Sequence, residues 1–165
     1  MNHEAEIEGI GVSVDDDGMG APAVVLSVRG EFVPIFVSPD QAQSMAFALE
    51  NEPPERPLTH DLLIDMITEF GGAIDRVRVD DLAEGTFYAK VDAERYEEGE
   101  RDVFVFDARP SDGIALALRV DCPVLVSETV IDRAGRPPEE FEMRGVEDDA
   151  ETGVDAFRDD DPEWR

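Results

Sequence analysis

Cysteine, lysine and long hydrophobic runs are almost or wholly missing from this chain. The single cysteine, Cys122, excludes a disulfide within the chain, and the absence of a Cys-x-x-Cys pair leaves no zinc signature. No run of 18 apolar residues is present, so no segment is expected to span a membrane. The first residues, MNHEAEIEGI, are acidic and lack the hydrophobic core of a secretory signal. We therefore expect a cytoplasmic protein without a membrane partner.

Basic residues are also scarce. The chain has 41 acidic and 14 basic residues among 165, for a net charge of −27, and Lys90 is its one lysine. With 42% hydrophobic residues in periodic segments, it is predicted to fold rather than to remain disordered. An acidic, lysine-poor surface suits a cytoplasm of molar salt, so we expect an extreme halophile; an ordinary acidic cytosolic protein is the alternative. Nucleic-acid partners are not excluded, because the Debye length falls to roughly 3 Å in 1 M salt.

Hydrophobic periodicity predicts one compact α+β domain with a mostly antiparallel, twisted sheet and three to four helices. Short turns between the first apolar runs indicate an antiparallel meander, and Pro34 favours an edge strand for the third run. Ser38, Pro39 and Gln41 form a capping box at a helix start. The expected strands are residues 10–14, 23–28, 32–37, 74–79, 86–92, 101–107 and 123–126, and the expected helices are 39–50, 59–70, 111–120 and a short turn at 127–131.

Charge divides the chain into two parts. Residues 139–165 contain 12 acidic and 3 basic residues, and apolar residues become sparse after Met143. We therefore predict a folded domain over residues 1–138 and an acidic, mobile tail over residues 139–165.

Two predicted helices begin with nearly the same letters, RPLTHD at residues 56–61 and RPSD at residues 109–112. Proline, a hydroxyl residue and aspartate in a first turn are ordinary capping residues, which accounts for much of the pattern. Capping does not explain the arginines, His60, or Asp107 at the end of a strand. Arginine beside a helix start binds phosphate, and imidazole next to carboxylate moves protons near neutral pH.

These groups are the components of a phosphodiesterase site. Aspartates at one helix start can hold Mg²⁺ or Mn²⁺ or orient His60, and no organic cofactor is expected. His3 is set aside because it lies in an N-terminus that we expect to be frayed. The candidate catalytic residues are His60, Asp61, Asp107 and Asp112, the candidate metal ligands are Asp61, Asp107 and Asp112, and the candidate phosphate-binding residues are Arg56, Arg109 and Ser111.

The segments RPLTHDLL, GTFYAK and DARPSDGIALALR, in this order, resemble the bifunctional nuclease domain, over roughly residues 5–132. The resemblance implies a compact α+β domain, often a homodimer, with nuclease activity toward DNA and RNA, and the composition suggests a haloarchaeal member. One departure is Gly113, where alanine is usual; glycine there would loosen the helix start. No residue-level mechanism comes with the resemblance, so the roles above rest on the residues alone.

The working hypothesis is a nuclease that acts on DNA, RNA or both. The alternative is a non-catalytic module that binds a protein or ligand, in which the same polar network only ties helices together. The two differ in geometry: a site requires the side chain of His60 or Asp61 to approach that of Asp107, Arg109 or Asp112.

Overall fold

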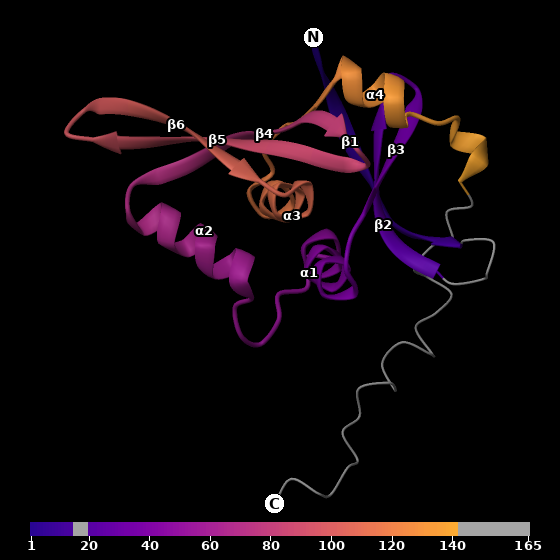
Figure 1. Ribbon diagram of the computed structural model, residues 1–165. Coiled ribbons are helices and arrows are strands. Elements are labelled where there is room, and N and C mark those ends of the chain that lie inside the picture. Colours follow the sequence, from indigo (N-terminus) through magenta and orange to yellow (C-terminus); the bar gives the residue numbers. More distant parts are fainter. Residues whose placement is uncertain (15–19, 142–165) are drawn as a thin grey trace, which may run out of the picture.

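A seven-stranded sheet is the framework of the protein in the computed structural model, which describes residues 1–14 and 20–141 (Figure 1). The strand order is β3-β2-β1-β7-β4-β5-β6. All neighbouring strands pair antiparallel except β4 and β7, which are parallel. The strands are β1 (Asn2–Val14), β2 (Gly20–Val28), β3 (Glu31–Phe36), β4 (Gly72–Ala83), β5 (Thr86–Glu97), β6 (Glu100–Ala108) and β7 (Val124–Ser127).

Helices cover both faces of the sheet. Three of them, α1, α2 and α3, lie below the sheet in the view of Figure 1, and α4 lies above it. No helix among the described residues is both long and apolar enough to cross a bilayer. The helices are α1 (Pro39–Leu49), α2 (Thr59–Glu69), α3 (Pro110–Val120) and α4 (Glu128–Ala134), followed by a 3₁₀ turn at Pro138–Glu140. The predicted α+β class and the mostly antiparallel sheet are confirmed.

The N-terminal strand is longer than predicted. β1 begins at Asn2, and its residues 2–5 pair with β7 before the strand continues along β2. The expectation of a frayed terminus at His3 is therefore wrong, because His3 lies opposite Val126 in the sheet. Acidic residues at alternate positions hide this strand in the sequence, and pairing with a strand more than a hundred residues away forms it.

Short-range sequence patterns predicted the start of α1 and the edge position of β3 correctly. The side chains of Ser38 and Gln41 exchange hydrogen bonds with each other's backbone N–H, which confirms the capping box. β3 is an edge strand, as Pro34 predicts, and it pairs only with β2 apart from one bridge between Phe32 and Arg136. Phe32 also packs on Phe141, with ring centroids 5.6 Å apart. The proposed tail lies outside the described residues beyond Phe141.

The core lies between the sheet and α3. Residues 114–117 of α3, with the sequence IALA, are buried, and so are Val77 and Val79 of β4 beneath them. The helix comes unusually close to the sheet at Gly113. A Cβ atom there would lie 2.7 Å from Cγ1 of Val77, which is shorter than van der Waals contact allows. Gly113 therefore allows close packing of the helix on the sheet.

This contact predicts the outcome of Gly113→Ala. Alanine favours a helix by about 1 kcal/mol, whereas overpacking a core costs about 1–3 kcal/mol. We expect the melting temperature to fall, because the clash with Val77 outweighs the gain in helix propensity. In a Val77→Ala background the same substitution should raise the melting temperature. A rise in both backgrounds would contradict the packing argument.

Candidate functional site

Capping does not account for the hydroxyl residues of the two similar helix starts. The N-cap residues are Leu58 for α2 and Arg109 for α3, so Thr59 and Ser111 already lie inside their helices. At α2 the carboxylate of Asp61 accepts a hydrogen bond from the Leu58 N–H at 2.8 Å. No side chain caps α3.

The two helix starts meet through His60 and Asp112. Nε2 of His60 lies 3.0 Å from Oδ1 of Asp112, although the residues are 52 positions apart. The guanidinium of Arg109 donates to the same carboxylate, from Nε to Oδ2 at 2.7 Å and from Nη2 to Oδ1 at 3.2 Å. The side chain of Arg109 is 70% exposed, whereas that of His60 is 15% exposed. The predicted approach is therefore confirmed, as a chain of imidazole, carboxylate and exposed guanidinium that we call the His60–Asp112–Arg109 chain.

Ser44 of α1, which we did not single out from the sequence, extends this chain inward. Its Oγ lies 3.1 Å from Nδ1 of His60 and accepts a hydrogen bond from Nη2 of Arg119 at 3.0 Å. Since arginine only donates, the hydroxyl proton of Ser44 remains available to Nδ1. This assigns the neutral imidazole a proton on Nε2, which it donates to Asp112. Ser44 is buried, and its hydrogen bond to Nδ1 holds the ring of His60 in position.

Arg119, near the end of α3, ties the three helices together. It donates to Oδ1 of Asp61 at 2.7 Å, to the carbonyl of Ala115 at 2.8 Å and to the carbonyl of Ser44 at 3.1 Å. Its side chain is only 8% exposed. Asp61 therefore neutralises a buried guanidinium, and this inner part of the network is structural.

Electrostatics keep both carboxylates ionised. Burial by itself would raise the pKa of Asp112, but hydrogen bonds from Arg109 and His60 outweigh it and the pKa is lowered. Burial likewise acts to raise the pKa of Asp61, and the hydrogen bonds from Arg119 and the Leu58 N–H reverse the effect. Each aspartate is thus an anion held between positive or N–H groups at neutral pH.

Three predicted residues make no side-chain hydrogen bond or ion pair with this chain of residues. The carboxylate of Asp107 accepts a hydrogen bond from Nζ of Lys90 at 2.7 Å. Asp107 and Lys90 are paired residues on the face of the sheet opposite α3, because Val91, the next residue, is buried in the core. Ser111 is buried, and Arg56 is exposed in the loop before α2, where it makes no side-chain hydrogen bond or ion pair within the described residues.

The predicted metal ligands do not converge in this arrangement. Asp61, Asp107 and Asp112 are each bonded to a different cationic side chain. Residues 1–14 and 20–141 contain no group of three His, Cys, Asp or Glu side chains placed to share an ion. A centre built from these three carboxylates does not fit the geometry.

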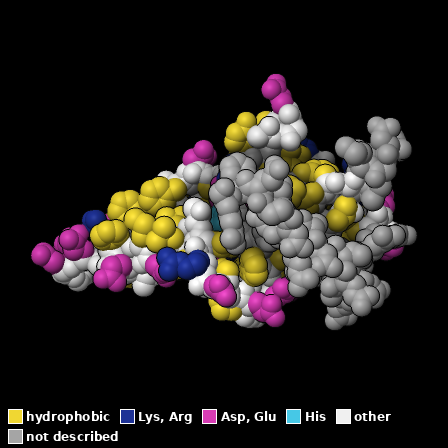
Figure 2. Space-filling model, turned by 90° about the horizontal axis from the view of Figure 1, so that it is seen from below, with side chains coloured by type: hydrophobic (Ala, Val, Ile, Leu, Met, Phe, Trp, Pro, Cys, Tyr) yellow, Lys and Arg dark blue, Asp and Glu magenta, His cyan; other side chains and the backbone are white. Residues whose placement is uncertain are grey.

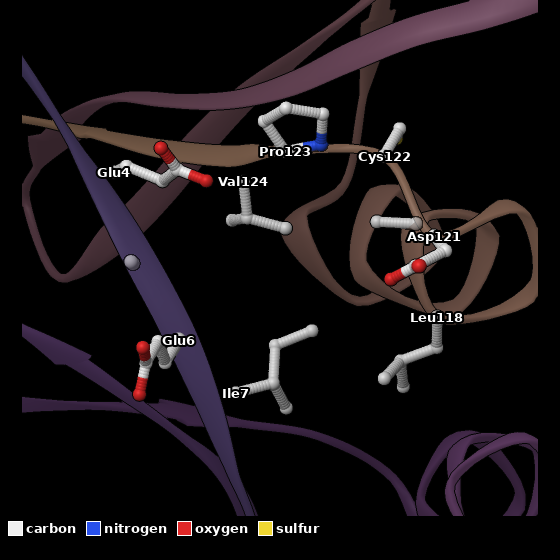
Figure 3. A pocket seen from close by; sticks show the side chains of 10 residues that line it. Glu4, Glu6, Ile7, Leu118, Asp121, Cys122, Pro123 and Val124 are labelled. Atoms are coloured by element: carbon white, nitrogen blue, oxygen red, sulfur yellow. The ribbon is translucent and has the colours of Figure 1, made fainter.

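A separate pocket of about 340 Å³ lies between β1 and the turn that follows α3 (Figure 3). Its lining includes the carboxylates of Glu4, Glu6 and Asp121 and contains no basic residue, so it would repel a phosphate. Burial raises the pKa of the Cys122 thiol at this pocket to about 11, which keeps it protonated and unreactive at neutral pH. The pocket shares no residue with the His60–Asp112–Arg109 chain.

Comparison with known proteins places the chain in a family. Residues 24–139 match the bifunctional nuclease domain. An uncharacterized protein of Mycobacterium tuberculosis, found in strains CDC 1551 and H37Rv, is 36% identical over 131 residues, which cover 79% of this chain and 76% of that protein. These relatives are bacterial, and a haloarchaeal origin of the present chain remains a prediction. The chain belongs to the bifunctional nuclease domain family.

Proposed function

We propose that the protein is a nuclease that hydrolyses phosphodiester bonds of DNA, RNA or both. The observation that carries the proposal is the His60–Asp112–Arg109 chain, because it places an exposed cation beside a group able to transfer protons. The name of the family supports the same chemistry.

Arg109 is the phosphate-binding residue of this proposal. Its guanidinium is exposed and is held in orientation by the carboxylate of Asp112. Arg109 is also the N-cap residue of α3, and the unpaired N–H groups at a helix start favour an anion. A phosphate that binds Arg109 competes with Asp112 for the same N–H donors. Binding would therefore weaken the interaction that lowers the pKa of Asp112 and make the His60–Asp112 pair a better base.

Proton transfer falls to the His60–Asp112 pair. In the proposed step, a water molecule attacks the phosphorus atom while its proton passes to the pair. The bond from phosphorus to the leaving oxygen breaks, and the pair returns the proton to that oxygen. Arg109 stabilises the negative charge that builds up on the phosphate oxygens. Asp61 and Arg119 hold α1, α2 and α3 in place and do not touch the substrate.

No step of this proposal passes through a metal ion. The three candidate carboxylates are separately bonded to Arg119, Lys90 and Arg109, so they do not form a common metal centre. A requirement of the activity for Mg²⁺ or Mn²⁺ is a separate matter and stays a prediction. Roles for Asp107, Ser111 and Arg56 in substrate binding also stay predictions. The expected setting is the cytoplasm of a halophile, where molar salt screens the repulsion between this acidic protein and a nucleic acid.

A specific observation favours the alternative of a non-catalytic protein- or ligand-binding module. Both ring nitrogens of His60 are already hydrogen-bonded, to Ser44 and to Asp112, so that neither is free to accept a proton without rearrangement. In that case the network would serve only to join the three helices.

Cleavage of labelled single-stranded DNA and RNA by the purified chain in molar KCl, with and without EDTA, tests the proposal. We expect Arg109→Ala to lower the rate about 10–100-fold, as for loss of a charge-assisted contact in the transition state. The matched control is Arg136→Ala, an exposed arginine outside the network, which should leave the rate unchanged. A parent protein with no cleavage above background, or equal losses in the two variants, would favour the binding module.

A further inference from the structure

Two phenylalanine rings of strand β6 lie on the same side of the sheet as the candidate site. Phe106 is paired with Val91 of β5, which is buried in the core on the side of α3. Paired residues and alternate residues of a strand share one face of a sheet, so Phe104 also lies on this side. Phe104 is 38% exposed and Phe106 is 54% exposed. The two rings therefore continue the α3 side of the sheet as an open surface.

The rings are arranged as a flat apolar surface, which we call the Phe104–Phe106 platform. Their centroids are 6.1 Å apart and their planes differ by only 14°. The guanidinium of Arg95 lies over the ring of Phe104, 5.7 Å from its centroid, and is neutralised by Glu97 and Asp102. Figure 2 shows hydrophobic side chains gathered on the arm of the molecule that contains β6. Parallel exposed rings of this kind suit a planar ligand that can stack on them.

The platform leads directly to the candidate site. Phe106 is three residues before Arg109, a distance of roughly 10 Å along an extended chain. The residue between them on the same face is Ala108, whose side chain is small. Arg109 is held by Asp112, which is bonded to His60. A ligand with a phosphate at Arg109 therefore has its neighbouring groups beside the two rings.

We propose that the Phe104–Phe106 platform stacks against the unpaired bases of a single-stranded nucleic acid whose phosphate lies at Arg109. The inference rests on the proposed function, since it takes Arg109 as the phosphate-binding residue. Every base has a flat π-face, so stacking on aromatic side chains accepts any sequence and either sugar. In a duplex these faces are covered by neighbouring bases. The platform therefore favours single strands of DNA or RNA over duplexes.

The charge of the chain favours this mode of binding. A protein of net charge −27 repels phosphates, and contacts between phosphate and arginine weaken as salt is added. Stacking of a base on an aromatic ring requires no net charge on the protein. An acidic protein can therefore hold a nucleic acid in molar salt by stacking its bases, with Arg109 needed only to place one phosphate.

The sequence of β6 separates stacking from a general apolar contact. The strand alternates as VFVF over residues 103–106, so Val103 and Val105 lie on the face away from α3, where they are 60% and 57% exposed. Burial of apolar area against another protein can use valine as well as phenylalanine. Stacking requires a flat ring, and the rings of this strand lie only on the side of the candidate site.

Binding by a His60→Gln protein tests the platform separately from catalysis. Fluorescence anisotropy in molar KCl gives the dissociation constants of labelled oligothymidine and oligouridine. Adding Phe106→Leu should weaken both about 5–150-fold, the range for loss of one base stack, because leucine keeps apolar area but removes the ring. Adding Phe106→Tyr should leave binding unchanged. The matched control is Phe36→Leu on the other edge strand, an exposed phenylalanine whose loss should not affect binding.

Two further ligands identify what the ring contacts. An abasic oligonucleotide retains its phosphates and lacks bases, and a duplex retains both but covers the base faces. Each should bind weakly and be insensitive to Phe106→Leu. Binding that depends on Phe106, in a parent that shows no cleavage, would support the platform and reject the nuclease.

Three results would overturn the platform. The first is no binding of either single strand by the His60→Gln protein. The second is equal binding with phenylalanine or leucine at position 106, or abasic binding as tight as that of the normal strand. The third is a change of mass in light scattering when Phe106→Leu is introduced, since this would assign the ring to a contact between copies of the chain.

Discussion

His60→Gln is expected to lower the rate of nucleic-acid cleavage at least about 100-fold, the lower end of what a general acid or base contributes. Glutamine can still donate from its amide nitrogen toward Asp112, so the hydrogen bond between α2 and α3 is retained. It cannot take up and release a proton at neutral pH. The melting temperature should therefore stay close to that of the parent while the rate falls, and both are measured on the same preparation.

His60→Ala supplies the complementary result. Alanine removes the hydrogen bonds to Ser44 and Asp112, each worth about 0.5–1.5 kcal/mol, so this variant should lose stability as well as rate. His3→Gln is the matched control, because His3 is the other histidine of the chain and lies at the opposite end of β1 from the turn to β2. It should cleave like the parent.

The outcome that would contradict a proton-transfer role is specific. If His60→Gln cleaves like the parent while His60→Ala loses stability and rate together, the ring would serve only to position Asp112. Activity that persists in both, at the level of a contaminating nuclease purified in parallel, would remove the enzyme proposal. The binding-module alternative would then remain.

Much of the fold can be predicted from local patterns in the sequence. The similar sequences of the two helix starts, RPLTHD and RPSD, also predict that these starts lie close together. Ser38 and Gln41 lie three residues apart, so their capping box can be read directly. The approach of the two helix starts is predicted because both begin with an Arg-Pro pair, and capping leaves the arginines and His60 unexplained. Such features can be predicted where the partner residue is a few positions away in the sequence, as for Ser38 and Gln41, or where the residue type itself suggests a function, as for His60.

The inner half of the network could not be read in this way. Ser44 and Arg119 are 75 positions apart, and each looks ordinary where it stands, as a serine within a helix and an arginine at a helix end. The one available signal was that Arg119 closes an otherwise apolar helical run, where a charged group needs a buried partner. Likewise, the spacing of Leu62, Met66 and Phe70 indicates an apolar face of α2 but does not say what covers it, and within one chain that face is exposed.

The fold itself is expected to be lost as salt is removed. A net charge of −27 opposes compaction, and screening by molar KCl relieves this repulsion. Lowering KCl toward about 0.1 M, where the Debye length reaches about 10 Å, should abolish the helical circular dichroism signal. Full structure in dilute buffer would remove the inference of a halophile.

The structure allows a sharper version of this experiment, because it separates paired from unpaired carboxylates. Glu4 and Glu6 line the acidic pocket and make no ion pair within the described residues, so their repulsion is relieved only by salt. In Glu4→Gln/Glu6→Gln the KCl concentration at which half the protein is folded should fall, since each relieved repulsion is worth up to about 1 kcal/mol in water.

Glu94→Gln/Glu97→Gln is the matched control, since it changes the net charge by the same amount. These two glutamates are bonded to Arg101 and Arg95, and losing the pairs offsets the reduced repulsion. The KCl midpoint of this control should stay the same or rise. Equal decreases in the two variants would mean that total charge, rather than its placement against arginine, sets the salt requirement of the fold.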